Sequence, residues 1–288
     1  MRRLAPFALA ALAGVPLHAQ QAAPAASPKR PITQDDYDRW RTIGGATLSP
    51  DGRWAAWTES PVVGDGELLL RETRGTRTLR VPRGWTGRPV TSVQVDSPFA
   101  AQFSADSRWL AAIAYAPKAE FDRARGARGR QSARTSLVLV PLGDGAAPQP
   151  VTIPRVRSFR LPRTAATAIA YLLEPDSAAA PASRDSAARR PAGDSARRPA
   201  VRDFGSTLVV RTLATGAEAR IADVVNYAFS PDGKWLAYTV GSRANQRDGA
   251  WLRDVATGAE LALATGIGNY RQLVFDRAGK RVAFASDR

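Results

Sequence analysis

The chain has 288 residues and a formal net charge of +15, from 41 Lys and Arg against 26 Asp and Glu, with no cysteine and one histidine. That histidine, His18, lies in an apolar N-terminal stretch. Residues 19–288 therefore cannot hold a Ser-His-Asp triad, a Cys-His pair, a zinc site built from His and Cys, or a disulfide.

Residues 1–19 are predicted to be a signal peptide. Two arginines follow the first methionine, residues 4–17 are mostly apolar, and Ala19 is a small residue of the kind that signal peptidase accepts. The apolar run is shorter than the roughly 20 residues of a membrane span. We therefore expect a secreted or periplasmic protein without a membrane span, in which residues 20–41 form a leader segment.

A short repeat recurs along residues 42–288. Its copies begin at positions 48, 103, 159, 229 and 275, and the clearest copy, residues 229–238, reads Phe-Ser-Pro-Asp-Gly-Lys-Trp-Leu-Ala-Tyr. Proline presets φ for a turn, aspartate can accept bonds from the turn backbone, and glycine adopts a positive φ. Apolar residues on both sides then predict two paired antiparallel strands in each copy.

Two further strands are predicted after these pairs. Residues 66–71, 136–140 and 207–211 have the composition of a third strand, and Gly-containing turns at 214–217 and 256–259 introduce a fourth. Four antiparallel strands in about 45–50 residues are typical of a β-propeller blade. We therefore predict an all-β fold, a partial β-propeller of about four and a half blades in an open arc. A β-sandwich with chance repetition is the alternative.

Two insertions interrupt the repeat. Residues 117–134 carry six basic and two acidic side chains, and residues 175–203 consist almost entirely of Ala, Pro, Ser, Asp and Arg. The second has little to bury and is predicted to be disordered. Both fall between the second and third strands of their blades. Because strand direction alternates, both should emerge on the same face of the propeller.

The repeat resembles a Ser-Pro-Asp-Gly propeller repeat that two groups share. One is the N-terminal propeller of secreted prolyl oligopeptidase-family serine peptidases, of the dipeptidyl-peptidase and acylaminoacyl-peptidase types. The other is the periplasmic propeller protein of the Tol system. Residues 31–40, which run into the first repeat, look like the segment that precedes the first blade in bacterial members of the peptidase family.

The resemblance to the peptidases implies a C-terminal α/β-hydrolase domain with a Gly-x-Ser-x-Gly nucleophile elbow. Residues 1–288 contain no such motif, so no catalytic residue, cofactor site or metal site is assigned to any position. We interpret the chain as the non-catalytic propeller portion of a peptidase, inactive alone, that gates and positions peptide substrates for the absent hydrolase domain. A stand-alone periplasmic propeller that binds other proteins is the alternative.

The charged residues suggest three other functions. The resemblance to dipeptidyl-peptidases implies carboxylates that capture a substrate amine, for which Glu120 and Asp122 are candidates, but no matching motif supports that role and a solvated charged loop explains the two residues better. The arginine excess raises nucleic-acid binding, but residues 117–134 and 151–163 hold more than half of it in a loop and a connection, so no nucleic-acid partner is expected. A set of turn aspartates could bind metal, but they lie one per blade, too dispersed to share an ion: Asp51, Asp106, Asp232 and Asp276.

Overall fold

The computed structural model describes residues 31–37, 40–86, 101–126, 134–143, 149–175, 202–244 and 247–288. The predicted signal peptide, most of the leader segment and most of the 175–203 insertion lie outside the described residues.

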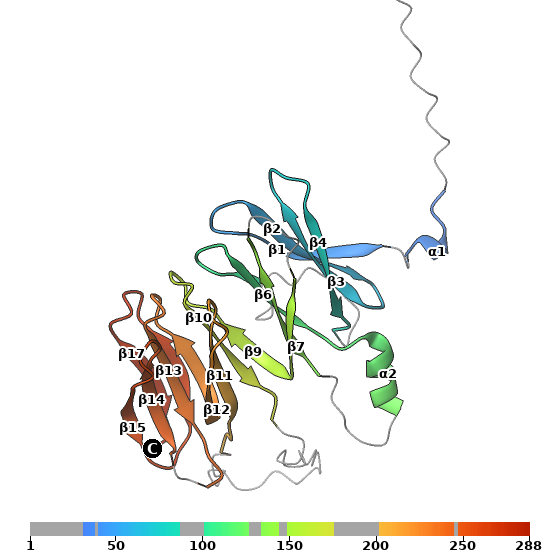
Figure 1. Ribbon diagram of the computed structural model, residues 1–288. Helices are drawn as coiled ribbons and strands as arrows, with labels where there is room; N and C mark the ends of the chain where they lie inside the picture. The colour runs from blue at the N-terminus through green and yellow to red at the C-terminus, as the bar shows by residue number, and fades with distance from the viewer. Residues whose placement is uncertain are drawn as a thin grey trace, which may run out of the picture.

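The first two blades are separate four-stranded antiparallel sheets, each with its strands in chain order. Blade 1 consists of β1 (Arg41–Leu48), β2 (Trp54–Pro61), β3 (Gly66–Glu72) and β4 (Thr78–Gly84). Blade 2 consists of β5 (Gln102–Phe103), β6 (Trp109–Ala114), β7 (Ser136–Pro141) and β8 (Val151–Pro154). Figure 1 shows blade 1 in blue to cyan and blade 2 mainly in green. The predicted third strands are therefore β3 and β7.

Blades 3 and 4 share a strand, a feature that the repeat does not predict. The seven-stranded sheet contains β9 (Val156–Arg160), β10 (Ala168–Leu173), β11 (Ser206–Thr212), β12 (Glu218–Phe229), β13 (Trp235–Val240), β14 (Gly249–Asp254) and β15 (Glu260–Thr265). The first half of β12 pairs with β11 and completes blade 3, and its second half pairs with β13 and begins blade 4. A register shift between Val224 and Asn226 separates the halves.

The remaining strands form a two-stranded fifth unit, β16 (Tyr270–Phe275) with β17 (Val282–Ser286). The described residues thus form an all-β partial propeller of four four-stranded blades and half of a fifth, which confirms the predicted fold class. In the part of the chain that the structure describes, two short helices accompany the strands, α1 (Gln34–Tyr37) and α2 (Lys118–Gly126).

The repeated turn is built by a serine hydroxyl. In blade 4, Ser230 Oγ accepts a hydrogen bond from Trp235 N at 2.9 Å and donates one to Asp232 Oδ1 at 2.6 Å. Asp232 Oδ1 in turn accepts from Lys234 N at 3.1 Å, while Gly233 takes a φ of 70°. The same bonds recur around Ser49 and Ser104. The side chains of the motif therefore fix the turn that the sequence predicted.

Two copies of the turn depart from the pattern. Ser107 stands at the glycine position of blade 2 with a φ of 60°, and its Oγ accepts from Asp51 N of blade 1 at 3.0 Å. In blade 5, Asp276 occupies the serine position, since its Oδ1 accepts from Arg281 N at 3.0 Å, five residues on. Asp276 therefore does not occupy the turn position of Asp51 and Asp232, although the sequence groups it with them as a turn aspartate.

The core lies between blades rather than in one centre. Leu68, Leu70 and Leu110 are buried where blade 1 meets blade 2. Tyr171 and Phe159 belong to the equivalent cluster between blades 2 and 3, and a third apolar cluster joins blade 3 to blade 4. Alternate faces of each middle blade are thus buried against different neighbours, as stacked blades require.

Candidate functional site

The connections that carry both insertions emerge on one face. Strand direction alternates within a blade, so the links between second and third strands lie at the same end as the links from one blade to the next. This end, the insertion face, also contains Asp65 of blade 1, the 241–248 link of blade 4, and Asn269 before β16. The Ser-Pro-Asp-Gly turns lie at the opposite end.

The first insertion is attached to the blades on both sides of it. At its start, Lys118 N donates to Asp65 Oδ1 of blade 1 at 2.7 Å. Just past its end, Thr135 N and Thr135 Oγ1 each donate to Glu174 Oε1 at 2.9 Å. Glu174 follows β10 and precedes the second insertion, so the bases of the two insertions are bonded to each other.

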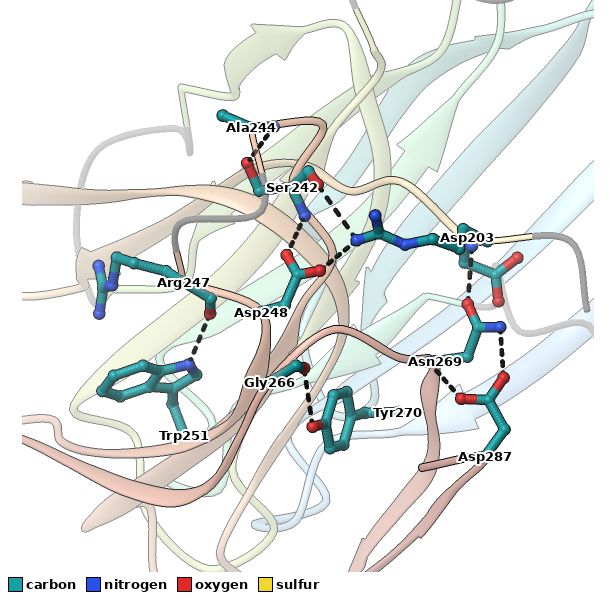
Figure 2. Close-up of polar contacts among 11 residues, drawn as sticks. Asp203, Ser242, Ala244, Arg247, Asp248, Trp251, Gly266, Asn269, Tyr270 and Asp287 are labelled. Atoms are coloured by element: carbon teal, nitrogen blue, oxygen red, sulfur yellow. Dashed lines mark hydrogen bonds and ion pairs between the residues drawn. The ribbon is translucent and has the colours of Figure 1, made fainter.

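The far end of the second insertion is held by a buried carboxylate. Asp248 has a side chain only 1% exposed, and it forms an ion pair with Arg202. Its other oxygen accepts from Ser242 N at 2.7 Å, and Ser242 O accepts from Arg202 at 3.2 Å. Figure 2 shows Asp248 directed at Ser242 and at this guanidinium. Blade 4 therefore anchors residue 202.

Asp203 extends the contact to blade 5. Asp203 N donates to Asn269 Oδ1 at 2.8 Å, and Asn269 Nδ2 donates to Asp287 Oδ2 at 2.7 Å (Figure 2). Asp203 Oδ2 accepts from Arg271 Nε at 2.7 Å. The bond from Asn269 N, at 2.7 Å, and that from its side chain hold the pKa of Asp287 below the ordinary 3.8. Asp203 and Asn269 thus join blade 3 to blade 5 across blade 4.

Close backbone packing supports this junction. Gly241 N donates to Asp223 O at 2.9 Å, and Gly205 N donates to Gly241 O at 3.0 Å. A Cβ added at Gly241 would lie 2.3 Å from Asp203 O. Glycine is therefore required where the chain leaves β13, because the base of the second insertion occupies the space of a side chain.

An aromatic group lies exposed beside the junction. Phe204 is 42% exposed, and the guanidinium carbons of Arg243 and Arg202 lie 4.6 Å and 5.3 Å from its ring centroid. Trp251 is covered similarly by Arg247, whose carbon lies 4.6 Å from the ring, and Trp251 Nε1 donates to Arg247 O. Aromatic and arginine side chains of this kind are enriched at protein interfaces.

The carboxylates suggested for amine capture do not converge. Asp122 is paired with Lys118 one helical turn away, Nζ to Oδ2 at 2.5 Å, and Glu120 is exposed on the same helix. Helix α2 places both on a charged solvent-facing segment. Whether either one binds a substrate stays a prediction.

The other candidates have local roles or lie outside the described residues. Asp51 and Asp232 each bond to their own turn, and in the described residues no three His, Cys, Asp or Glu side chains gather as a metal site. His18 lies outside the described residues. Within them, no helix has the length and apolarity needed to cross a membrane.

No family model and no curated protein matches this chain. Among solved structures it is similar to TolB from Acinetobacter baumannii, with 14% identity and a TM-score of 0.33 over 77% of this chain and 43% of that one. It is also similar to the Pyrococcus horikoshii acylaminoacyl peptidase, with 9% identity and a TM-score of 0.41 over 79% of this chain and 33% of that one. It is also similar to the β-propeller domain of the Trilobed protease from Pyrococcus furiosus, with 7% identity and a TM-score of 0.39 over 79% of this chain and 59% of that one.

This chain spans less than half the length of the first two proteins. The strand order and register of this chain by themselves define the propeller architecture.

Sequence patterns did not predict the polar junction of Arg202, Asp203, Asp248 and Asn269. These residues lie in three connections whose spacing has no repeat, so no pattern joins them. The one available signal was the change from Ala, Pro and Ser back to mixed polar and apolar residues near position 202.

Proposed function

We propose that this chain is the propeller portion of a secreted serine peptidase of the prolyl oligopeptidase family, in which it gates and positions peptide substrates for a hydrolase domain. The proposal starts from the Ser-Pro-Asp-Gly repeat and the segment before it. The observation that carries it is the attachment of both insertions to one face, through Thr135 and Glu174 and through Arg202 and Asp248.

This attachment suits a gating surface. A loop that selects substrates must be presented from a rigid scaffold in a fixed direction. The bases of both insertions are bonded to neighbouring blades, so their positions are fixed relative to one another and to the insertion face. A hydrolase domain placed over that face would receive peptides past both insertions.

Sequencing the gene beyond codon 288 tests the proposal directly. The reading frame is expected to continue into a Gly-x-Ser-x-Gly segment followed by Asp and His. A stop codon at position 289 overturns it. The chain as given is expected to be unreactive toward a fluorophosphonate probe, because it lacks the His base, whereas the longer product is expected to be labelled.

The longer product also tests the gating role. Deleting residues 176–201 is expected to raise hydrolysis of long peptides relative to short ones while leaving fluorophosphonate labelling intact. Gating is contradicted if the ratio of the hydrolysis rate of long peptides to that of short peptides is the same before and after the deletion. N-terminal sequencing of the exported protein, with a new terminus after Ala19, tests secretion.

A stand-alone protein-binding propeller is a second candidate. The exposed Phe204, with the guanidinium groups of Arg202 and Arg243 near its ring, favours this candidate, since aromatic and arginine side chains are enriched at protein interfaces. A gene that ends at codon 288, with a monodisperse product that unfolds cooperatively, supports this candidate and contradicts the first.

A further inference from the structure

Strand β9 has two exposed arginines with no ion pair among the described residues. β9 is the last strand at one end of the seven-stranded sheet, and Arg157 and Arg160 are both exposed on it. Arginines of several other strands, by contrast, are paired with carboxylates. These pairs are Arg41–Glu67, Arg80–Glu67, Arg211–Glu218, Arg253–Glu260 and Arg271–Asp203. The positive charge of β9 is therefore left uncompensated within the described part of the chain.

A bulge in β9 lies beside a hydroxyl contact between blades 3 and 4. Leu172 pairs with Ser158 and Leu173 pairs with Val156, so Arg157 is the extra residue of a β-bulge. Ser158 and Arg160 are two residues apart and share a face of the strand. Ser158 Oγ lies 3.0 Å from the hydroxyl of Tyr227, which comes from the blade 4 half of β12. Ser158, which has an exposed arginine beside it at 157 and another at 160, thus contacts Tyr227 of blade 4.

The local field at this cluster is positive. Burial raises the pKa of Tyr227 to about 12, and Ser158, Arg160 and Arg157 act against that rise. The phenol is therefore protonated at neutral pH and can donate a hydrogen bond. The charged groups that act most strongly on it are both cationic, so a negative group placed beside it would be stabilised.

We propose that Arg157, Ser158, Arg160 and Tyr227 form a binding site for the oxyanion of a ligand, a carboxylate or a phosphate. Arginine binds both groups through parallel N–H donors, and serine and tyrosine hydroxyls supply further donors of the kind such oxygens accept. The four residues present donors and positive charge with no carboxylate among them, which disfavours a cation. The site includes none of the residues of the junction around Asp248 and does not depend on a peptidase parent.

Binding to the full chain tests the proposal. Calorimetric titrations use inorganic phosphate, the peptide acetyl-Ala-Glu-Ala-amide, and the same peptide with glutamine in place of glutamate. One of the first two probes is expected to bind saturably, and the glutamine peptide to bind at least about tenfold more weakly than the glutamate peptide if the ligand group is a carboxylate. Preference for phosphate over the glutamate peptide assigns the site to a phosphate instead.

Two variants separate the site from general charge. R160Q is expected to weaken binding of the preferred probe by about tenfold or more. The matched control R71Q removes an exposed arginine from β3 of blade 1 and is expected to change it by less than about twofold. Y227F keeps the charge and removes one hydroxyl, and is expected to weaken binding by about three- to tenfold.

Three results overturn the proposal. The first is that neither inorganic phosphate nor the glutamate peptide binds saturably. The second is that R160Q and R71Q lose the same amount of binding, and the third is that R160Q and Y227F both bind as tightly as the unaltered chain. Circular dichroism and thermal unfolding of each variant establish that it is folded. Both arginines are exposed, so their replacement leaves the core between blades unchanged.

Discussion

Glu174 accepts two hydrogen bonds from Thr135 through a single oxygen, one from the backbone N and one from Oγ1, each 2.9 Å long. Thr135 precedes β7 and Glu174 follows β10, so the contact joins blades 2 and 3. Thr135 Oγ1 also lies 2.6 Å from Val156 O, the first residue of β9. The side chains of Thr135 and Glu174 thus connect blades 2 and 3, whose described strands belong to separate sheets.

Replacing Glu174 with alanine is expected to destabilise the chain by about 1–3 kcal/mol, because Thr135 N loses its acceptor in a half-buried place. Urea unfolding measures the loss, and hydrogen exchange of the Thr135 amide is expected to accelerate. The control Glu120→Ala removes an exposed glutamate of α2 and is expected to change stability by less than about 0.5 kcal/mol. Similar costs for the two variants contradict the assigned role.

Arg202→Met is expected to cost about 3–5 kcal/mol, since it leaves the buried carboxylate of Asp248 without its cation. The double variant Arg202→Met/Asp248→Asn is expected to recover part of the loss, because asparagine keeps an acceptor for Ser242 N and carries no charge. Chemical unfolding of the single and double variants gives the coupling. A double variant less stable than Arg202→Met refutes the buried-charge explanation.

Asp276→Ser is expected to change stability by less than about 1 kcal/mol, because a serine hydroxyl accepts the equivalent bond from the backbone in three other turns. Asp276→Ala removes the acceptor for Arg281 N and is expected to destabilise blade 5 by about 1 kcal/mol more. Thermal unfolding distinguishes them. Equal melting temperatures for the two variants would show that position 276 does not act as the serine of the motif.

Acid is expected to weaken the turn of blade 4. The hydrogen bond from Ser230 and that from Lys234 N hold the pKa of Asp232 below its ordinary 3.8. A lowered folded-state pKa means that the contribution of Asp232 is present above pH 3.8 and is lost as the pH falls through the folded value. Asp232→Asn should therefore reduce the slope of unfolding free energy against pH below about 4. Glu120→Gln serves as the control, and an unchanged slope in Asp232→Asn contradicts the prediction.

The sequence predicted the blades well because their turns are local. Ser230, Asp232 and Gly233 lie within four residues, and the hydrogen bonds of Ser230 and Asp232 join residues that are close in sequence. A copy with altered residues is harder to align, as at Asp276, where a carboxylate accepts the backbone hydrogen bond that a serine hydroxyl accepts in the other turns. The network around Asp248 depends on which connections meet in space, and helix α2 lies in an insertion whose composition has no apolar periodicity. Neither could be predicted from local patterns.

The continuous strand β12 has a consequence for how the molecule comes apart. Blades 3 and 4 are linked by one backbone hydrogen-bond ladder from β9 to β15, whereas side chains and isolated bonds connect the other blades. Opening between blades 3 and 4 would require β12 itself to be broken. These two blades should therefore exchange their amide hydrogens as a single cooperative unit, and partial unfolding should begin at the boundaries on either side of it.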